Sequence, residues 1–236
     1  MKETKSGTPE KRRLLKGEQG RSPNDGLRTW SAVTHGVGAG LAVLGAALLL
    51  VRAVTLGTIW HIVAFAVYGA TMIGLYTAST LYHSVRTSDK GRIALRKYDH
   101  ASIYFLIAGT YTPICLVALR GPWGWSVFGV IWALALGGLV LSVKWIMAPR
   151  WLTAGIYLFM GWLALVPLVP LHKAAPGALF WLLLGGLLYT VGGISYALKW
   201  PGRGNPRFGC HEIFHVFIVL GSLAHYMLMY RVIAFL

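Results

Sequence analysis

Acidic residues are scarce in this sequence, and charge of either sign is sparse. Only 7 of the 236 residues are Asp or Glu, against 22 Lys or Arg, and charged residues make up 12% of the chain. Hydrophobic residues make up 56%, and the mean hydropathy is +0.60. A soluble domain of this size could not bury so much apolar surface, so the composition predicts an integral membrane protein.

Cysteine is nearly absent as well. Cys115 and Cys210 are the two cysteines, and both adjoin or lie within apolar segments. One such pair does not indicate a disulfide framework. Cys210 stands next to His211 and could serve as a metal ligand, although a free buried thiol is the commoner role of such a residue.

The shortage of acids leaves a net charge of +15, which in a soluble protein would suggest nucleic-acid binding. Here the basic residues lie in the N-terminal tail and in loops beside apolar segments, where topology signals belong. We therefore expect no nucleic-acid partner and expect membrane lipids as the partners of this chain.

The first 28 residues differ from the rest of the chain. Residues 1–28 contain eight lysines and arginines and show no apolar periodicity. This composition predicts a disordered, basic cytoplasmic tail ahead of a membrane domain over residues 29–236. The tail is not a signal peptide, because the first apolar run comes late and is too long for the core of one.

Seven apolar segments follow, each long enough to cross a bilayer as a helix. Pro167 and Pro170 are expected to kink or end the fifth of them near its far side. The sequence thus predicts an all-α membrane protein with a bundle of seven transmembrane helices. The predicted spans are residues 29–51, 58–83, 100–119, 123–143, 151–172, 177–198 and 211–235.

The orientation of the bundle follows from the positions of the basic residues. The tail and the connections that follow spans two, four and six lie on one side of the membrane. They hold 18 of the 22 lysines and arginines, and the opposite side holds 4. Because basic residues concentrate on the cytoplasmic side, we expect a cytoplasmic N-terminus, an outside C-terminus and a location in the cell membrane.

The last span opens with Cys210-His211-Glu212-Ile213-Phe214-His215. Two histidines four residues apart lie on one face of a helix, about 6 Å apart, and can bind one metal ion. With Glu212 between them the pattern is H-E-x-x-H, which is typical of zinc peptidases that use the glutamate as a general base. Glu212 is, however, rotated about 100° from His211, so it need not face a metal that the two histidines share.

Other polar residues are expected at the same depth. With the predicted topology, His83 ends span two, and Asp99 and His211 start spans three and seven on the same side. Ser79 lies one turn deeper than His83 on the same helix face, and His35 faces the same leaflet. Ionisable groups at membrane depth are costly and mark a functional site by default. Their convergence favours a metal site that includes His83.

The remaining histidines have plainer explanations. His61 and His172 fall near the outer leaflet, where an interfacial or hydrogen-bonded role is usual. His225 follows His211 by 14 residues and lies about 21 Å deeper, too far to share a metal, so it is expected to make a buried polar contact within the bundle. His35 and His100 could orient metal ligands through hydrogen bonds from a ring nitrogen.

Five motifs lie within or at the ends of these spans: Thr34-His35-Gly36, Ser79-Thr80-Leu81-Tyr82-His83-Ser84, Asp99-His100-Ala101-Ser102-Ile103-Tyr104, Ile107-Ala108-Gly109-Thr110-Tyr111-Thr112-Pro113 and His211-Glu212-Ile213-Phe214-His215. Together they resemble the hemolysin III family, over about residues 24–235. That family is the bacterial branch of the progestin and adiponectin receptor (PAQR) group, in a superfamily that also includes alkaline ceramidases.

The resemblance implies a seven-helix bundle with Zn²⁺ held by His83, His211 and His215. It further implies that Asp99 holds the water on the metal and that Ser79 hydrogen-bonds within the site. Related receptors can carry glutamine at the position of Glu212, which argues against an essential base there.

Four functions are compatible with these residues. The first is a zinc-dependent hydrolase of a lipid amide or ester, with Asp99 and Ser79 as catalytic residues and a substrate that enters from the cytoplasmic leaflet. The second is a pore-forming cytolysin, as the family name suggests, although no amphipathic hairpin supports it. The third is a regulator or sensor of membrane state with structural zinc. The fourth is an intramembrane protease that depends on Glu212.

Overall fold

The computed structural model describes residues 27–203, 205 and 207–236, so the predicted tail lies outside the described residues except for its last two. Within this part the chain is helical and contains no strand. The α-helices are α2 (Thr29–Leu56), α3 (Ile59–Ser84), α4 (Asp89–Pro113), α5 (Pro122–Lys144), α6 (Arg150–Trp162), α7 (Leu168–Ala174), α8 (Ala178–Leu198) and α9 (Cys210–Arg231). Short π and 3₁₀ turns extend three of them: η2 (Ile114–Ala118), η3 (Leu163–Leu165) and η4 (Ile233–Phe235).

Six of these helices are long and apolar enough to cross a membrane, and a bent pair of helices makes a seventh crossing if the pair is counted as one span. The pair joins Arg150–Leu165 to Leu168–Ala174 at an angle of 53°. Pro167 caps α7, and Pro170 lies in its first turn, where a backbone N–H has no partner within the helix. The predicted all-α bundle and the kink in its fifth span are confirmed.

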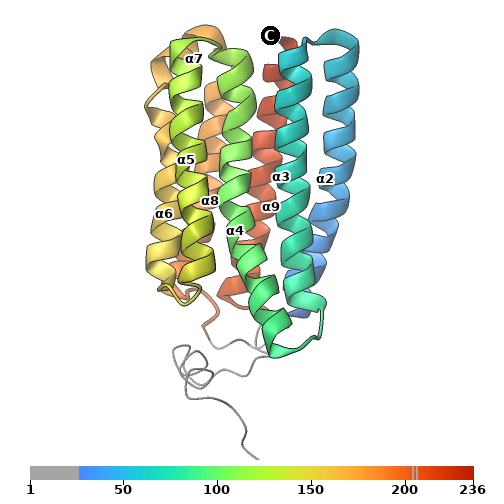
Figure 1. Ribbon diagram of the computed structural model, residues 1–236, viewed down its shortest axis with the longest axis vertical. Coiled ribbons are helices and arrows are strands. Elements are labelled where there is room, and N and C mark those ends of the chain that lie inside the picture. The colour runs from blue at the N-terminus through green and yellow to red at the C-terminus, as the bar shows by residue number, and fades with distance from the viewer. Residues whose placement is uncertain (1–26, 204, 206) are drawn as a thin grey trace, which may run out of the picture.

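The helices stand side by side along one axis (Figure 1). α2 packs against α3 and α9, α8 packs against α6 and α9, and α4 packs against α3 and α5. Of the apolar stretch in α4, 72% is buried, against 22% in α5. α4 is therefore an interior helix, and α5 lies at the edge of the bundle.

The connections predicted to share one side of the membrane do lie together. The α3–α4, α5–α6 and α8–α9 connections and the start of α2 are at one end of the bundle, and the C-terminus is at the other (Figure 1). The basic segments therefore gather at one end, as the charge pattern predicts. That this end is cytoplasmic stays a prediction.

The first span is five residues longer than expected, since α2 continues to Leu56, and the start of the third span differs more. Residues 86–97 were expected to form a basic loop, with the third span starting near residue 100, but α4 already begins at Asp89. Ser88 caps the helix by accepting a hydrogen bond from the N–H of Gly91. Asp99 therefore lies inside the helix, ten residues after its start, rather than at its end.

Arg92 explains why the basic stretch is helical. Its side chain is buried, and the guanidinium lies 4.5 Å from the centre of the Tyr82 ring. The guanidinium also donates hydrogen bonds to the carbonyl groups of Tyr82 and Val85 at the end of α3. These contacts offset part of the cost of burying the charge, since only Nη1 of the guanidinium has hydrogen-bond partners among the described residues. They depend on tertiary structure that a local charge pattern does not reveal.

Two glycines allow helices to approach closely. A Cβ atom on Gly138 of α5 would lie 2.3 Å from the ring of Tyr104 on α4. A Cβ atom on Gly185 of α8 would lie 2.3 Å from the ring of His225 on α9. Small residues at such points let helices pack within a membrane, where apolar lipid supplies little driving force for association.

Candidate metal centre

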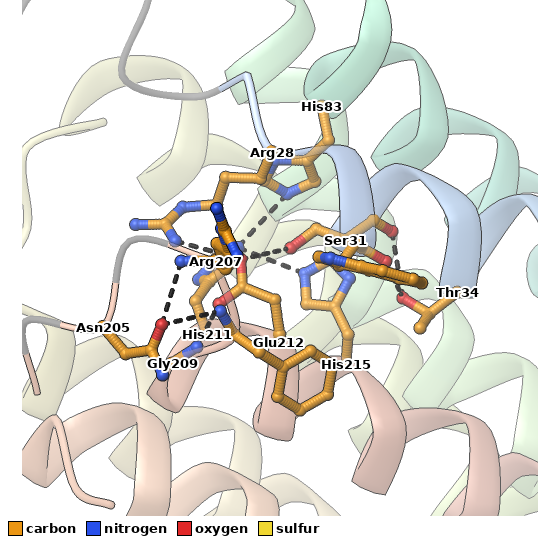
Figure 2. Close-up of polar contacts among 12 residues, drawn as sticks. Arg28, Ser31, Thr34, His83, Asn205, Arg207, Gly209, His211, Glu212 and His215 are labelled. Carbon is orange, nitrogen blue, oxygen red and sulfur yellow. Dashed lines mark hydrogen bonds and ion pairs between the residues drawn. The ribbon is translucent and has the colours of Figure 1, made fainter. Parts of the chain in front are cut away.

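Three histidines converge where the end of α3 meets the start of α9. The Nε2 atoms of His83 and His211 are 3.2 Å apart, and those of His211 and His215 are also 3.2 Å apart. One ring nitrogen from each lies within 4.8 Å of the other two. His83 and His215 are buried, and His211 is half-buried. The structure thus brings together the three predicted metal ligands, as Figure 2 shows.

This geometry fits a metal ion. Imidazole nitrogens bind zinc at about 2.0–2.1 Å, so two ligands of a tetrahedral ion lie about 3.3 Å apart. A neutral ring nitrogen carries either a hydrogen or a lone pair, so the Nε2 of His211 cannot both donate to one neighbour and accept from the other. A cation between the rings would satisfy all three lone pairs. The three imidazoles can therefore hold a metal ion.

Asp99 and Ser79 lie beside the same centre. Both side chains are buried, and both line a cavity that also touches His211 and His215. Asp99 comes from the interior helix α4, and its Oδ2 is 3.5 Å from the Nδ1 of His100. The structure thus places the predicted carboxylate and hydroxyl at the cavity wall, next to two of the three metal ligands.

The cavity has a volume of about 130 Å³ and runs into the bundle between α4, α6, α8 and α9. Apart from the polar end, most of its wall is apolar. Gly161 and Leu165, at the bend of the fifth span, line it and are themselves exposed. Representative wall residues are Leu75, Ile103, Ile107, Leu182 and Ile218.

Glu212 does not line this cavity. It is 1% exposed, and its Oε2 accepts a hydrogen bond from the N–H of Gly209 at 2.9 Å. Its Oε1 accepts from Arg28 Nη1 at 3.0 Å and from Ser31 Oγ at 3.1 Å (Figure 2). The carboxylate therefore joins the starts of α2 and α9. This agrees with the expectation that Glu212 need not face the metal.

The pattern of the sequence did not reveal the role of Arg28, which was assigned to the tail. A signal was nevertheless present. Glu212 is one of only two acidic residues beyond position 90, and a buried acid in a membrane span requires a partner. Arg28 is the last basic residue before the first span, on the same side of the membrane.

His35 and His100 do not act as predicted. The ring of His35 stacks on His215 with centroids 3.8 Å apart, and both of its nitrogens are buried without a hydrogen-bond partner among the described residues. This stacking replaces the predicted hydrogen bond from a ring nitrogen to a metal ligand. His100 contacts Asp99 rather than a ligand histidine.

His225 forms a buried polar contact, as predicted. Its Nδ1 is 3.0 Å from the carbonyl oxygen of Gly221, and its ring stacks on Tyr189. Cys210 has a half-buried free thiol, and it is not part of the metal-binding group found among the described residues.

Together, the fold and this site define a helical multi-pass membrane protein with three clustered histidines, which could hold a metal ion, at one end of its bundle. The family model described as "Haemolysin-III related" matches residues 24–226. The chain belongs to this haemolysin-III-related family.

Individual relatives agree with that family. The Hemolysin-3 homolog of Bacillus subtilis (strain 168) is 41% identical over 195 residues, which cover 82% of this chain and 88% of the relative. Hemolysin-3 of Bacillus cereus is 41% identical over 196 residues, covering 81% and 85%. The Adiponectin receptor protein of Drosophila melanogaster is 29% identical over 194 residues, covering 70% and 43%. The chain is thus similar to proteins of the PAQR group as well.

Proposed function

We propose that this protein is a zinc-dependent hydrolase of a lipid amide or ester. The observation that carries the proposal is the meeting of three imidazoles and a buried carboxylate at one end of an apolar cavity. His83, His211 and His215 would hold the ion. Three protein ligands leave one position of a tetrahedral zinc ion open, which is typical of catalytic rather than structural sites.

When bound, zinc supplies Lewis acidity that polarises a carbonyl group and activates water. Asp99 accepts a proton from the attacking water, because its carboxylate is the acidic group that lines the cavity beside the histidines. The hydroxyl group of Ser79 donates a hydrogen bond to the substrate at the same wall. The apolar walls take up the hydrocarbon part of the lipid and exclude water from it.

We place the protein in the cell membrane, with the metal centre near the cytoplasmic face and membrane lipids as its partners. The support is the position of the basic segments at the same end of the bundle as the histidines. A lipid substrate from the cytoplasmic leaflet would have the shortest path to the site.

The first arm of the test is metal content. Protein purified in detergent should contain about one zinc ion per chain, and the His211→Ala/His215→Ala variant should contain almost none, since one remaining imidazole does not retain the ion. His172→Ala is the matched control, because His172 is exposed and lies outside the cavity. A wild-type protein without metal would overturn the proposal.

The second arm is turnover of a fluorescent ceramide and of a matching fluorescent ester in mixed micelles. Asp99→Asn should keep zinc but lower turnover at least 100-fold, because the amide cannot take up the proton. Asp89→Asn is the control, since it makes the same change on the same helix outside the cavity. Turnover in Asp99→Asn equal to that of the wild type would contradict the assignment.

Other outcomes would favour the other functions. Bound zinc, no turnover of any lipid tested and unfolding on metal removal would favour a regulator with structural zinc. The names of the Bacillus relatives describe hemolysins, and channel currents that persist after loss of the three histidines would favour a pore. The protease function has the least support, because Glu212 is engaged away from the cavity.

A further inference from the structure

Glu212 is a buried carboxylate with donors on both oxygens from segments that are far apart in the sequence. Arg28 precedes α2, Ser31 lies in its first turn, and Gly209 precedes α9. Arg28 and Glu212 are separated by 184 positions in the chain. A buried charge is tolerated only when it is paired and hydrogen-bonded, so this arrangement fixes the starts of the two helices relative to each other.

Arg28 also reaches the third helix of the metal centre. Its backbone N–H donates a hydrogen bond, 3.1 Å long, to the carbonyl oxygen of His83. His83 lies in the last turn of α3, where carbonyl groups have no partner within the helix. Arg28 thus contacts one metal ligand, His83, through its backbone. Through its side chain it contacts Glu212, which follows another metal ligand, His211 (Figure 2).

We infer that Arg28 and Glu212 are positioning residues for the metal centre, and that their ion pair sets the distance between His83 and the two histidines of α9. The inference rests on the proposed metal function. Metal ligands must be held to within about 0.5 Å, and groups outside the ligand shell commonly change metal affinity 10- to 100-fold. The pair holds the two chain segments that carry these ligands.

Glutamine at position 212 makes a sharp test because it has nearly the same shape. Both carboxylate oxygens of Glu212 accept hydrogen bonds, whereas an amide offers one acceptor and one donor. In Glu212→Gln the amide nitrogen must face either the N–H of Gly209 or the Arg28–Ser31 side. The hydrogen bonds on one side of the residue 212 side chain are then lost without a large change in packing.

The experiment measures how fast zinc passes from the purified full-length protein to a coloured chelator. Arg28→Gln and Glu212→Gln should each release zinc at least tenfold faster than the wild type. Arg28→Lys, which keeps the positive charge, should release zinc more slowly than Arg28→Gln. The double variant should release zinc no more than about twofold faster than the faster of the two single variants, because the pair acts as one unit. Arg207→Gln, an exposed arginine on the neighbouring loop, is the control.

The outcomes separate this inference from the proposed function. If the wild type holds no zinc, the metal function fails, and the inference fails with it. If the wild type holds zinc and all variants release it at the wild-type rate, the metal centre stands and the inference is overturned, even where the unfolding midpoint falls. Should the single variants not fold, Ser31→Ala removes one donor only and must still release zinc at least twofold faster.

Discussion

At the residue scale, His35 combines a tightly packed ring with ring nitrogens that lack hydrogen-bond partners among the described residues. Its ring packs face to face on His215 and edge to face on Tyr76, so it occupies a fixed orientation. Both ring nitrogens are nevertheless buried without a partner among the described residues, although His35 lines the cavity. A buried unsatisfied polar group costs about 1–3 kcal/mol, and we therefore expect a role for His35 toward a polar group held in the cavity.

His35→Phe tests that role. Phenylalanine keeps the stacking on His215 but removes both nitrogens, so the free energy of unfolding should stay equal or rise by about 1 kcal/mol. Turnover of the fluorescent ceramide should fall at least tenfold. Both are measured on protein in detergent, with His172→Phe as the control at an exposed position. Unchanged turnover would show that His35 serves packing alone.

At the element scale, the position of α4 depends on a close contact with α5. Tyr104 of α4 is fully buried and also packs on Tyr157 of α6, with ring centroids 4.7 Å apart. Its ring cannot move away from Gly138, whose Cβ position is already occupied. Since α4 carries Asp99, this contact helps to place the carboxylate in the interior of the bundle.

Two adjacent glycines of α5 give a matched test of that contact. Gly138→Ala should lower the free energy of unfolding by about 1–3 kcal/mol, because the new methyl group overlaps the Tyr104 ring. Gly137→Ala should leave stability unchanged or raise it by up to about 1 kcal/mol, because nothing lies within 4 Å of its Cβ position and alanine favours helix. Thermal unfolding midpoints in detergent measure both. Equal midpoints would show that α4 and α5 can separate without cost.

At the scale of the whole molecule, the bundle has one basic end, which also carries the candidate metal centre. The start of α2 and the three connections at that end are where the positive residues gather, and the C-terminus lies at the opposite end. The rule that basic residues stay in the cytoplasm then predicts the orientation of the site as well as of the chain.

A reporter fused to the C-terminus tests this orientation. Alkaline phosphatase, which folds only outside the cytoplasm, should be active there, and a green fluorescent protein should be dark. The same reporters placed after Lys144, in the α5–α6 connection, should give the reverse pattern. A fluorescent C-terminal fusion would put the metal centre at the outer face and remove the cytoplasmic leaflet as the source of substrate.

The sequence by itself determined the all-α membrane fold, the approximate spans and the three histidines of the candidate metal centre. Apolar length and charge distribution are local properties, and the matching depth of His83, His211 and His215 follows from the predicted spans, helix geometry and the side of the membrane that the basic residues indicate. The tertiary structure decided the start of α4, the stacking of His35 and the pairing of Arg28 with Glu212. Each of these depends on how a helix is rotated about its axis and on which distant segment it meets, and neither is encoded in local spacing.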